Sequence, residues 1–344
     1  MKLNAAHSVA PAPDLADLAV RLEDAGCHGL YFAELAHDPF LAAAIAATGG
    51  TAMTLGTSIA LAFTRSPTTL AYTAQDLNAA TGGKFVLGLG PQVKTHIERR
   101  FGLEWREPVQ RMREVVLAMR AVWRCWQEGG PLDFQGELYR LSLMPPAFRP
   151  ENTDHGSPLV YLAAVGPKMA EVAGEVGDGL FVHAFSTPDY VRNVLLPAVD
   201  RGLARSGRSR ADFQMCYSAF IADTVAADSP ADARERARGL VAFYASTPDY
   251  RRVLDQHGIG ELQPRLRQMT REGAWDRMAD EISDEVLDLF CATGAPAELG
   301  EELGRRWGGL IDQMSLPVDF WLRHSDEREW QIAAARLTGS SATA

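Results

Sequence analysis

This 344-residue chain contains few cysteines and no long hydrophobic run. Its four cysteines, Cys27, Cys125, Cys216 and Cys291, lie far apart and form no CxxC pair, which argues against a disulfide framework and a zinc site. We expect them to be buried thiols in a reducing compartment. No stretch of about 18 apolar residues is present to span a membrane, and the segment MKLNAAHSVA lacks the apolar core of a signal peptide. These absences predict a cytoplasmic protein without a metal site.

Positive charge is also scarce. The chain has 34 basic and 44 acidic residues, a formal net charge of -10 and a pI near 5.3. Only four of the basic residues are lysines: Lys2, Lys84, Lys94 and Lys168. A nucleic-acid partner requires a basic surface, so this balance argues against one. With 47% hydrophobic residues, the composition is that of a globular enzyme, and we expect its partner to be a small-molecule substrate.

Strand-like and helix-like segments alternate along the chain. Strands are expected at residues 3–9, 28–34, 54–61, 85–88, 159–164, 179–184, 213–222 and 310–316. Helices are expected at residues 14–25, 39–48 and 67–80, and over a long stretch, 93–126, interrupted near Gly102 and Pro108. Apolar strands that alternate with amphipathic helices indicate a parallel sheet covered on both faces. About eight such units predict an α/β fold of the (β/α)8 TIM-barrel type.

Two segments interrupt this alternation. Residues 129–158 contain the hairpin-like sequence DFQGELYRL and then a proline-rich stretch, and residues 226–294 are mainly helical and too long for one crossover. We interpret both as insertions, after the fourth and the seventh strand, in a single domain that covers residues 1–344.

A glycine-rich turn lies in the segment KFVLGLGPQVKTHIERRFG, residues 84–102. An apolar strand runs into Gly88 and Gly90, and a polar stretch with a helical pattern follows. Backbone without side chains can approach a ligand closely, and a helix N-terminus attracts an anion such as phosphate. A Rossmann dinucleotide site would require a third glycine where this chain has Val93. The turn therefore predicts a phosphate site at Gly88, Gly90, Pro91 and Gln92, or else the glycines only permit a tight turn.

Two other strand ends carry small or polar residues. The sequence LGTSIA places Ser58 and Ile59 near the end of the third expected strand, and Arg65 follows. After the fifth strand comes a second candidate phosphate site, at a helix start, formed by Ala164, Val165, Gly166, Pro167 and Lys168. Strand carboxyl ends face the active-site mouth of a barrel. The structural alternative is that these are tight turns, with Lys168 solvated and Arg65 paired with a surface acid.

Four side chains are candidates for acid–base chemistry. Glu34 ends the second expected strand, His37 follows it, and His183 lies at the end of the sixth. His96 lies on the helix after the glycine turn and could face the same mouth. A carboxylate or an imidazole at such positions is suited to general acid or base catalysis, although a lone histidine is more often structural. No HExxH, Walker A or nucleophile-elbow pattern is present.

Taken in order, these segments resemble the luciferase-like family of flavin and deazaflavin oxidoreductases. The resemblance is carried by AG at residues 25–26, YFAE at 31–34, LGTSI at 55–59, RSP at 65–67, FVLGLG at 85–90 and AGEVGDG at 173–179. The sequences QVKTHIERRFG at 92–102 and FYASTP at 243–248 are similar to an actinobacterial subgroup that depends on coenzyme F420.

The resemblance implies a (β/α)8 barrel with the cofactor ring across its mouth. It implies a non-proline cis peptide at Ser58–Ile59 behind the ring, and a cofactor phosphate near Gly90, Pro91 and Gln92 and near Val165, Gly166 and Pro167. Lys94 and Lys168 would then lie close to an anionic cofactor. Relatives dimerise through helices beside the second and third strands, and the small-residue helix at residues 40–47 suits a homodimer.

The sequence departs from the family at two positions. Several deazaflavin-dependent relatives have an Asp-His pair where this chain has Glu34 and Leu35. Sugar-phosphate dehydrogenases of the family carry a lysine where this chain has residues 183–186, HAFS, so a sugar phosphate is not expected.

Three functions follow from these patterns. The first is hydride transfer between carbon 5 of coenzyme F420 and an unidentified organic substrate, with Glu34, His37, His96 or His183 as acid or base. The second is an FMN-dependent monooxygenase. The third is a barrel that binds a ligand without turnover.

Overall fold

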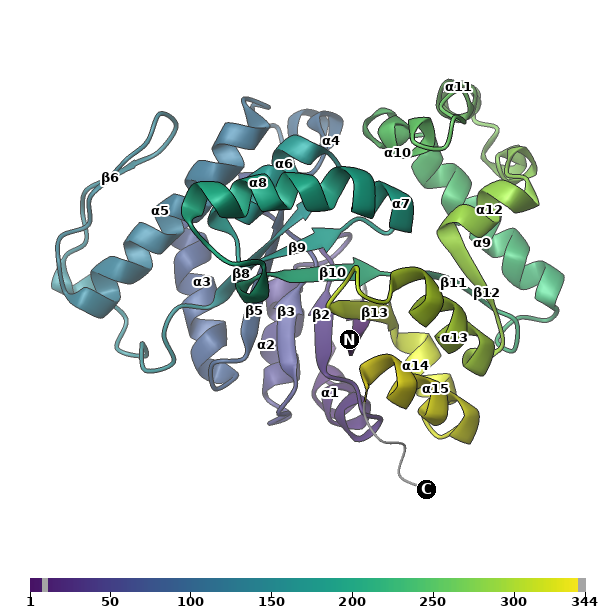
Figure 1. Ribbon diagram of the computed structural model, residues 1–344. Coiled ribbons are helices and arrows are strands. Elements are labelled where there is room, and N and C mark those ends of the chain that lie inside the picture. The colour runs from purple at the N-terminus through teal and green to yellow at the C-terminus, as the bar shows by residue number, and fades with distance from the viewer. Residues whose placement is uncertain (8–11, 340–344) are drawn as a thin grey trace.

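A computed structural model describes residues 1–7 and 12–339 as a closed parallel β-barrel surrounded by helices (Figure 1). Its strands are β1 (Lys2–His7), β2 (Gly29–Phe32), β3 (Thr54–Thr57), β5 (Phe85–Gly90), β8 (Leu159–Ala164), β9 (Gly179–Val182), β10 (Gln214–Ser218) and β13 (Gln313–Pro317). The two-residue strand β4 (Ala60–Leu61) extends β3 along β5. Pairing of β1 with β13 closes the ring. The predicted (β/α)8 fold is confirmed.

Helices cover the outer face of the barrel (Figure 1). They are α1 (Leu15–Asp24), α2 (Pro39–Ala47), α3 (Pro67–Ala80), α4 (Lys94–Arg99), α5 (Pro108–Glu128), α6 (Pro167–Val176), α7 (Pro188–Tyr190), α8 (Leu196–Ser206), α13 (Pro296–Trp307), α14 (Val318–His324) and α15 (Arg328–Thr338). On α5 the buried residues Met112, Val115, Met119 and Val122 recur at helical spacing, so one face packs inward. The expected helix break near Gly102 and Pro108 is found between α4 and α5.

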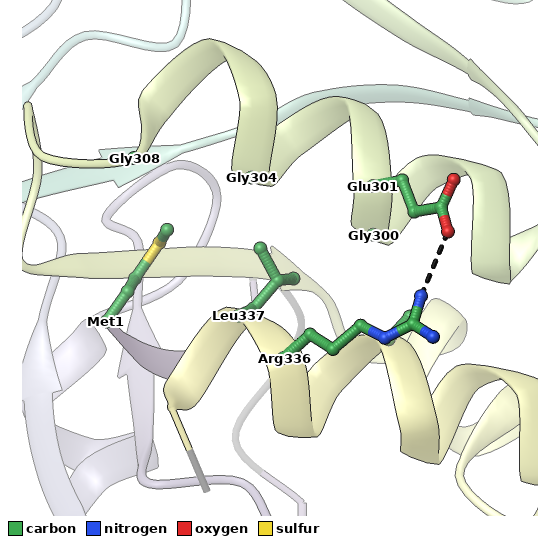
Figure 2. A pocket seen from close by; sticks show the side chains of 8 residues that line it. Met1, Gly300, Glu301, Gly304, Gly308, Arg336 and Leu337 are labelled. Carbon is green, nitrogen blue, oxygen red and sulfur yellow. Dashed lines mark hydrogen bonds and ion pairs between the residues drawn. The ribbon is translucent and has the colours of Figure 1, made fainter.

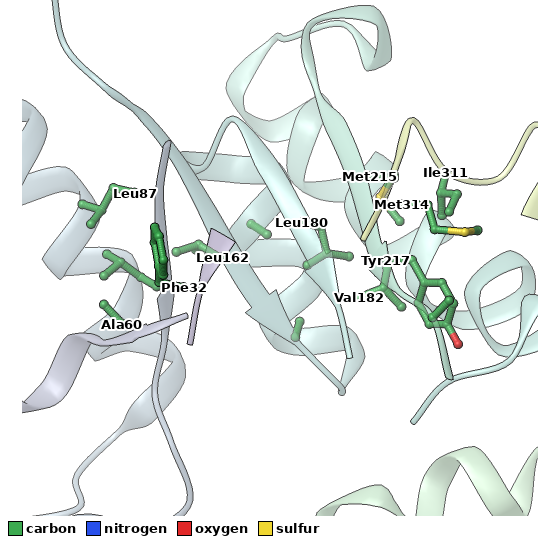
Figure 3. Close-up of a cluster of buried hydrophobic side chains, with 14 of the residues drawn as sticks. Phe32, Ala60, Leu87, Leu162, Leu180, Val182, Met215, Tyr217, Ile311 and Met314 are labelled. Atoms are coloured by element: carbon green, nitrogen blue, oxygen red, sulfur yellow. The ribbon is translucent and has the colours of Figure 1, made fainter. Parts of the chain in front are cut away.

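The main core lies between strands and helices, as Figure 3 shows for outward side chains such as Phe32, Leu87 and Leu162. A second cluster fills the barrel itself: Tyr31, Val86, Tyr161, Phe181 and Cys216. The rings of Tyr31 and Tyr161 each lie 5.5 Å from that of Phe181. The barrel interior is therefore packed core, and a ligand site must lie at the carboxyl ends of the strands.

Some expected strand limits were wrong. The strand expected at 85–88 continues to Gly90, and the one expected at 310–316 starts at Gln313. The part of the first strand expected at residues 8–9 lies outside the described residues. The strand expected at 54–61 is divided, because the peptide between Ser58 and Ile59 is cis and separates β3 from β4.

The segment expected as one strand at 213–222 forms two. After β10, the Ala219 amide donates to the Ser315 carbonyl, and the chain then leaves the barrel as β11 (Phe220–Asp223). Strand β11 pairs in parallel with β12 (Cys291–Gly294), which the prediction of a mainly helical 226–294 missed. The mainly apolar stretch 214–222 continues across Ala219 without a glycine or proline, so the sequence could not reveal the change of partner.

The two long connections have the expected character. The first contains a hairpin, β6 (Phe134–Gln135) and β7 (Arg140–Leu141), whose turn is held by the buried Glu114 carboxylate through the amides of residues 137–139. The second contains α9 (Pro230–Ala245), α10 (Arg251–Asp255), α11 (Leu262–Glu272) and α12 (Asp284–Phe290). No helix in the described part of the chain is both long and apolar enough to cross a membrane.

Gly88 provides a test of the barrel packing. A Cβ atom there would lie 1.8 Å from the Thr57 carbonyl oxygen and 2.6 Å from Phe181 Cε2. We expect Gly88→Ala to lower the free energy of unfolding by about 3 kcal/mol or more, because backbone must move. Urea denaturation measures the loss. The control is Gly130→Ala, where a Cβ meets nothing within 4 Å. Equal stability of the two variants would contradict the packing described.

Candidate functional site

An apolar floor closes the carboxyl end of the barrel. The cis peptide places Ile59 beside Gly90, where a Cβ would lie 2.8 Å from Ile59 Cδ1. Ile59 and Ala163 pack directly on the interior cluster. The bulge is held against the end of β2, because the Ser58 amide donates to Phe32 O (2.7 Å) and Ile59 O accepts from the Glu34 amide (3.1 Å). This surface can support a planar ring, since Ile59 and Ala163 are apolar and Gly90 has no side chain.

The two glycines of the turn have different environments. Gly88 lies inside the barrel, where its amide donates to Thr57 Oγ1 (2.9 Å) and its carbonyl accepts from that hydroxyl (2.7 Å). Gly90 ends β5 at the floor, and the loop begins at Pro91. Gln92 has a positive φ of 62° and its side chain accepts from the Val93 amide. The strand was expected to end at Gly88 but ends at Gly90, so the loop starts two residues later than expected.

The loops after β2 and β4 are joined by an ion-pair network on Arg65. Arg65 Nη1 lies 2.7 Å from Glu34 Oε2 and Nη2 lies 2.8 Å from Asp38 Oδ2. The same Glu34 oxygen accepts from the Leu61 amide (2.7 Å). Burial lowers the pKa of Arg65, but the hydrogen bonds and charges of Glu34 and Asp38 outweigh it and raise the pKa overall. One oxygen of Glu34 is thus committed to structure, and a role for Glu34 as catalytic base stays a prediction.

Other predicted residues lie on the exposed rim. His37, His96, Lys94 and Lys168 are all exposed. Lys94 Nζ lies 3.7 Å from Glu98 Oε1, one turn along α4. The structure brings none of these four to the floor, and their catalytic or cofactor-binding roles stay predictions.

His183 is the one predicted acid–base residue enclosed by aromatic side chains. It follows β9, and its ring lies 4.4 Å from that of Tyr250 and 5.0 Å from that of Tyr244. Its Nδ1 accepts from the Phe185 amide (3.0 Å), and its Nε2 lies 3.1 Å from Tyr250 Oη. Burial lowers the pKa of His183 to about 4, so the ring is neutral at pH 7.

The loop after β8 is lined by residues that the sequence did not predict. Ala164 ends β8, and Tyr190 Oη donates to the Val165 carbonyl (2.8 Å). A Cβ on Gly166, the residue before α6, would lie 2.6 Å from Arg252 Nη1. Burial raises the pKa of Tyr190 to about 12, and the nearby Arg252 guanidinium opposes this rise. Arg252 therefore brings a positive charge to the predicted phosphate loop at Gly166, whereas the side chain of Lys168 is exposed.

Arg252, Tyr250 and Tyr244 belong to the insertion between β10 and β13. Figure 1 shows α10 of this insertion at the same end of the molecule as α4. Nothing local in the sequence shows which strand ends an insertion will cover, so these three residues were not predicted as part of the site.

Two pockets lie away from this mouth. The first, of about 320 Å³, is lined by Gly300 and Gly304 of α13 and by Leu337 of α15, with Met1 at one side (Figure 2). Because Met1 precedes β1, this pocket lies toward the amino ends of the strands. The second also borders the start of β1, at Leu3. Neither pocket contains a predicted site residue.

Comparison with known proteins identifies the family. The protein-family model described as luciferase-like monooxygenase matches residues 2–313 of this chain. The chain belongs to this luciferase-like family. It is 42% identical over 303 residues to the uncharacterized protein Rv1360 of Mycobacterium tuberculosis, which covers 88% of this chain and 89% of the relative. It is 32% identical over 256 residues to 5,10-methylenetetrahydromethanopterin reductase of Archaeoglobus fulgidus, with 72% of each chain covered.

Two further comparisons agree with this family. The putative coenzyme F420-dependent oxidoreductase Rv3520c of Mycobacterium tuberculosis is 29% identical over 298 residues, which covers 81% of this chain and 83% of the relative. The structure of the coenzyme F420 dependent tetrahydromethanopterin reductase from Methanopyrus kandleri superposes with a TM-score of 0.75 at 21% identity, covering 95% and 98% of the two chains. The named relatives support an oxidoreductase, and the solved structure supports the fold.

The low pKa of His183 predicts a pH-dependent stability. The unfolded chain takes up a proton near pH 6.5, whereas the folded ring resists it until about pH 4. Stability therefore falls as the pH drops from about 6.5 to 4, by at most about 3 kcal/mol. We expect His183→Gln to show a smaller fall across this window in urea denaturation at each pH. Parallel curves for the two proteins would show that His183 is not buried in its neutral form.

Proposed function

We propose that this protein is an F420-dependent oxidoreductase that transfers a hydride between carbon 5 of the deazaflavin and a small organic substrate. The observation that carries the proposal is the cis Ser58–Ile59 bulge facing Gly90 on an apolar floor. Rv3520c, named for F420 dependence, adds support from sequence. A flavin mononucleotide monooxygenase is the alternative within the same family.

The residues at the mouth fit such a cofactor. Ile59, Gly90 and Ala163 would carry the ring, because Ile59 and Ala163 form an apolar surface over the interior cluster and Gly90 adds no side chain there. Gly166, without a side chain before α6, and the Arg252 guanidinium would hold the phosphate. When bound, the deazaflavin supplies or accepts the hydride. The Tyr190 hydroxyl fixes the Val165 carbonyl and so orients the phosphate loop.

The ion pairs of Arg65 would have a structural role in the proposed site. Arg65 joins Glu34 and Asp38, so the loop after β2 is tied to the segment after β4 on one side of the floor. This arrangement would keep the Ser58–Ile59 bulge in place when the ring binds, because the Glu34 amide donates to the Ile59 carbonyl.

A binding measurement tests the cofactor assignment. We expect F420 to bind more tightly than FMN in equilibrium dialysis, and Arg252→Gln to weaken F420 binding by about tenfold through loss of a charge-assisted hydrogen bond. The matched control is Arg251→Gln, since Arg251 pairs with Asp255 and Glu261. Tighter binding of FMN would support the monooxygenase instead. F420 binding without any hydride transfer would favour a ligand-binding barrel.

A homodimer is also proposed, through α2. This helix has no charged residue, and its outward side carries Leu41, which is 60% exposed, together with Ala44 and Ile45. An uncharged apolar helix face on a surface that is otherwise rich in charge suits contact with the same face of a second copy.

The expected dimer can be broken at one position. Leu41→Glu places two like charges in an isologous contact, so we expect the variant to be monomeric where the unaltered protein is dimeric. Light scattering after size-exclusion chromatography gives both masses. The control is Leu322→Glu, at a residue 38% exposed on α14. A monomeric unaltered protein would contradict the proposal.

A further inference from the structure

The hydrogen bond between His183 and Tyr250 has a defined direction. The Phe185 amide donates to His183 Nδ1 at 3.0 Å, so Nδ1 must be without a proton. A neutral imidazole then carries its single proton on Nε2. Nε2 lies 3.1 Å from Tyr250 Oη, and it is the donor in that bond.

This direction leaves the Tyr250 hydroxyl proton unused. Tyr250 Oη accepts from His183, and within the described residues it makes no second hydrogen bond. A phenol whose oxygen already accepts one bond can still donate its own proton. Tyr250 is partly exposed, so part of its side chain is open to a ligand.

Neighbouring contacts place Tyr250 beside the cofactor loop. Arg252, two residues further on, lies against Gly166 after β8. His183 follows β9, whose last residue Val182 pairs with Ala164. The segment 250–252 therefore spans the ends of two adjacent strands, with the guanidinium at one and the phenol at the other.

The surroundings of the pair are aromatic and carry little charge. The ring of Tyr244 lies 5.0 Å from that of His183, and Phe185 stacks on Phe290 at 4.2 Å. Desolvation is the cause of the low pKa of His183, and no charged group contributes to it. Burial raises the pKa of Tyr250, with smaller contributions from Tyr244 and the carboxylate of Asp249. Tyr250 thus remains protonated at neutral pH.

We propose that Tyr250 is the catalytic proton donor to the oxygen of a carbonyl substrate, an apolar or aromatic ketone or aldehyde, and that His183 is its positioning residue. The inference rests on the proposed function, because it takes the reduced deazaflavin as the hydride source. The aromatic walls select the apolar body of the substrate, and the Tyr250 hydroxyl binds its one polar atom.

The step balances as a two-electron reduction. The substrate carbon takes the hydride and forms a new C–H bond, while the C5–H bond of the reduced deazaflavin breaks and the deazaflavin is oxidised. The electron pair of the C=O π bond moves to the oxygen, which takes the proton from Tyr250 Oη. The resulting tyrosinate accepts from His183 Nε2–H and regains a proton from water. The product is an alcohol.

The first experiment measures turnover and cofactor binding together. With reduced F420 and the probes cyclohexanone and benzaldehyde, Tyr250→Phe should lower kcat by about 10²–10⁴-fold and leave the Kd for F420 unchanged. The control is Tyr72→Phe, because Tyr72 on α3 donates to the Phe148 carbonyl outside the mouth. Full turnover by Tyr250→Phe would overturn the role of Tyr250 and leave the proposed function standing. Absence of F420 binding by the unaltered protein would overturn the proposed function.

A pH profile distinguishes a role of His183 in positioning Tyr250 from a purely structural role. Below about pH 4 the His183 ring gains a proton on Nδ1, which opposes the Phe185 amide and breaks the arrangement. We expect kcat to fall through that pH, and His183→Gln, whose side-chain amide can still donate to Tyr250 Oη, to keep turnover without this acid limb. His183→Phe should lose turnover. Equal losses in both variants would assign His183 a structural role only.

A second measurement needs neither cofactor nor substrate. Nitrogen-15 NMR of the histidine side chains, with His183→Gln for assignment, should show a neutral ring protonated on Nε2 at pH 7 and a change in its shifts in Tyr250→Phe. A proton on Nδ1 would make Tyr250 the donor to His183 and overturn the inference. F420 binding without reduction of either carbonyl probe would overturn the substrate class.

Discussion

The close approach of β3 and β5 is the constraint on which the rest of the mouth depends. Thr57 and Gly88 exchange two hydrogen bonds through one hydroxyl, and no side chain fits between the strands. This contact is directly below the point where β3 ends, so the next peptide, Ser58–Ile59, must pass over the interior cluster. The flat floor is therefore a consequence of packing inside the barrel, and it does not require a ligand to form.

The two sides of the floor differ in their electrostatics. On the side of β2 and β4, Arg65, Glu34 and Asp38 form compensating charges near solvent. On the side of β9 and the insertion, His183 and Tyr250 are both uncharged at neutral pH, because burial opposes ionisation of each. A hydride acceptor placed between these two sides would have the ion pairs of Arg65 on one side and the neutral, hydrogen-bonded pair of His183 and Tyr250 on the other.

The sequence predicted the barrel well, because its apolar strands alternate with amphipathic helices along most of the chain. It predicted the cis peptide only through the resemblance. It did not predict where the chain leaves the barrel after β10, since Ala219 lies within an unbroken strand pattern. Nor did it predict Tyr250 or Arg252, because their importance comes from contacts with residues far away in the chain, His183 and Gly166. Local patterns carry no information about such contacts.

The parallel pairing of β11 with β12 brings the two ends of the long insertion together. Phe220 lies opposite Cys291 and Asp223 opposite Gly294, so the insertion leaves and rejoins the fold through one strand pair, and its length and sequence can change at small entropic cost to barrel closure. It carries both the Arg252 guanidinium beside Gly166 and the Tyr250 phenol beside His183. Under the proposed function, exchanging this one segment between relatives would change the groups that contact the cofactor and the substrate together, while the eight strands of the barrel stay the same.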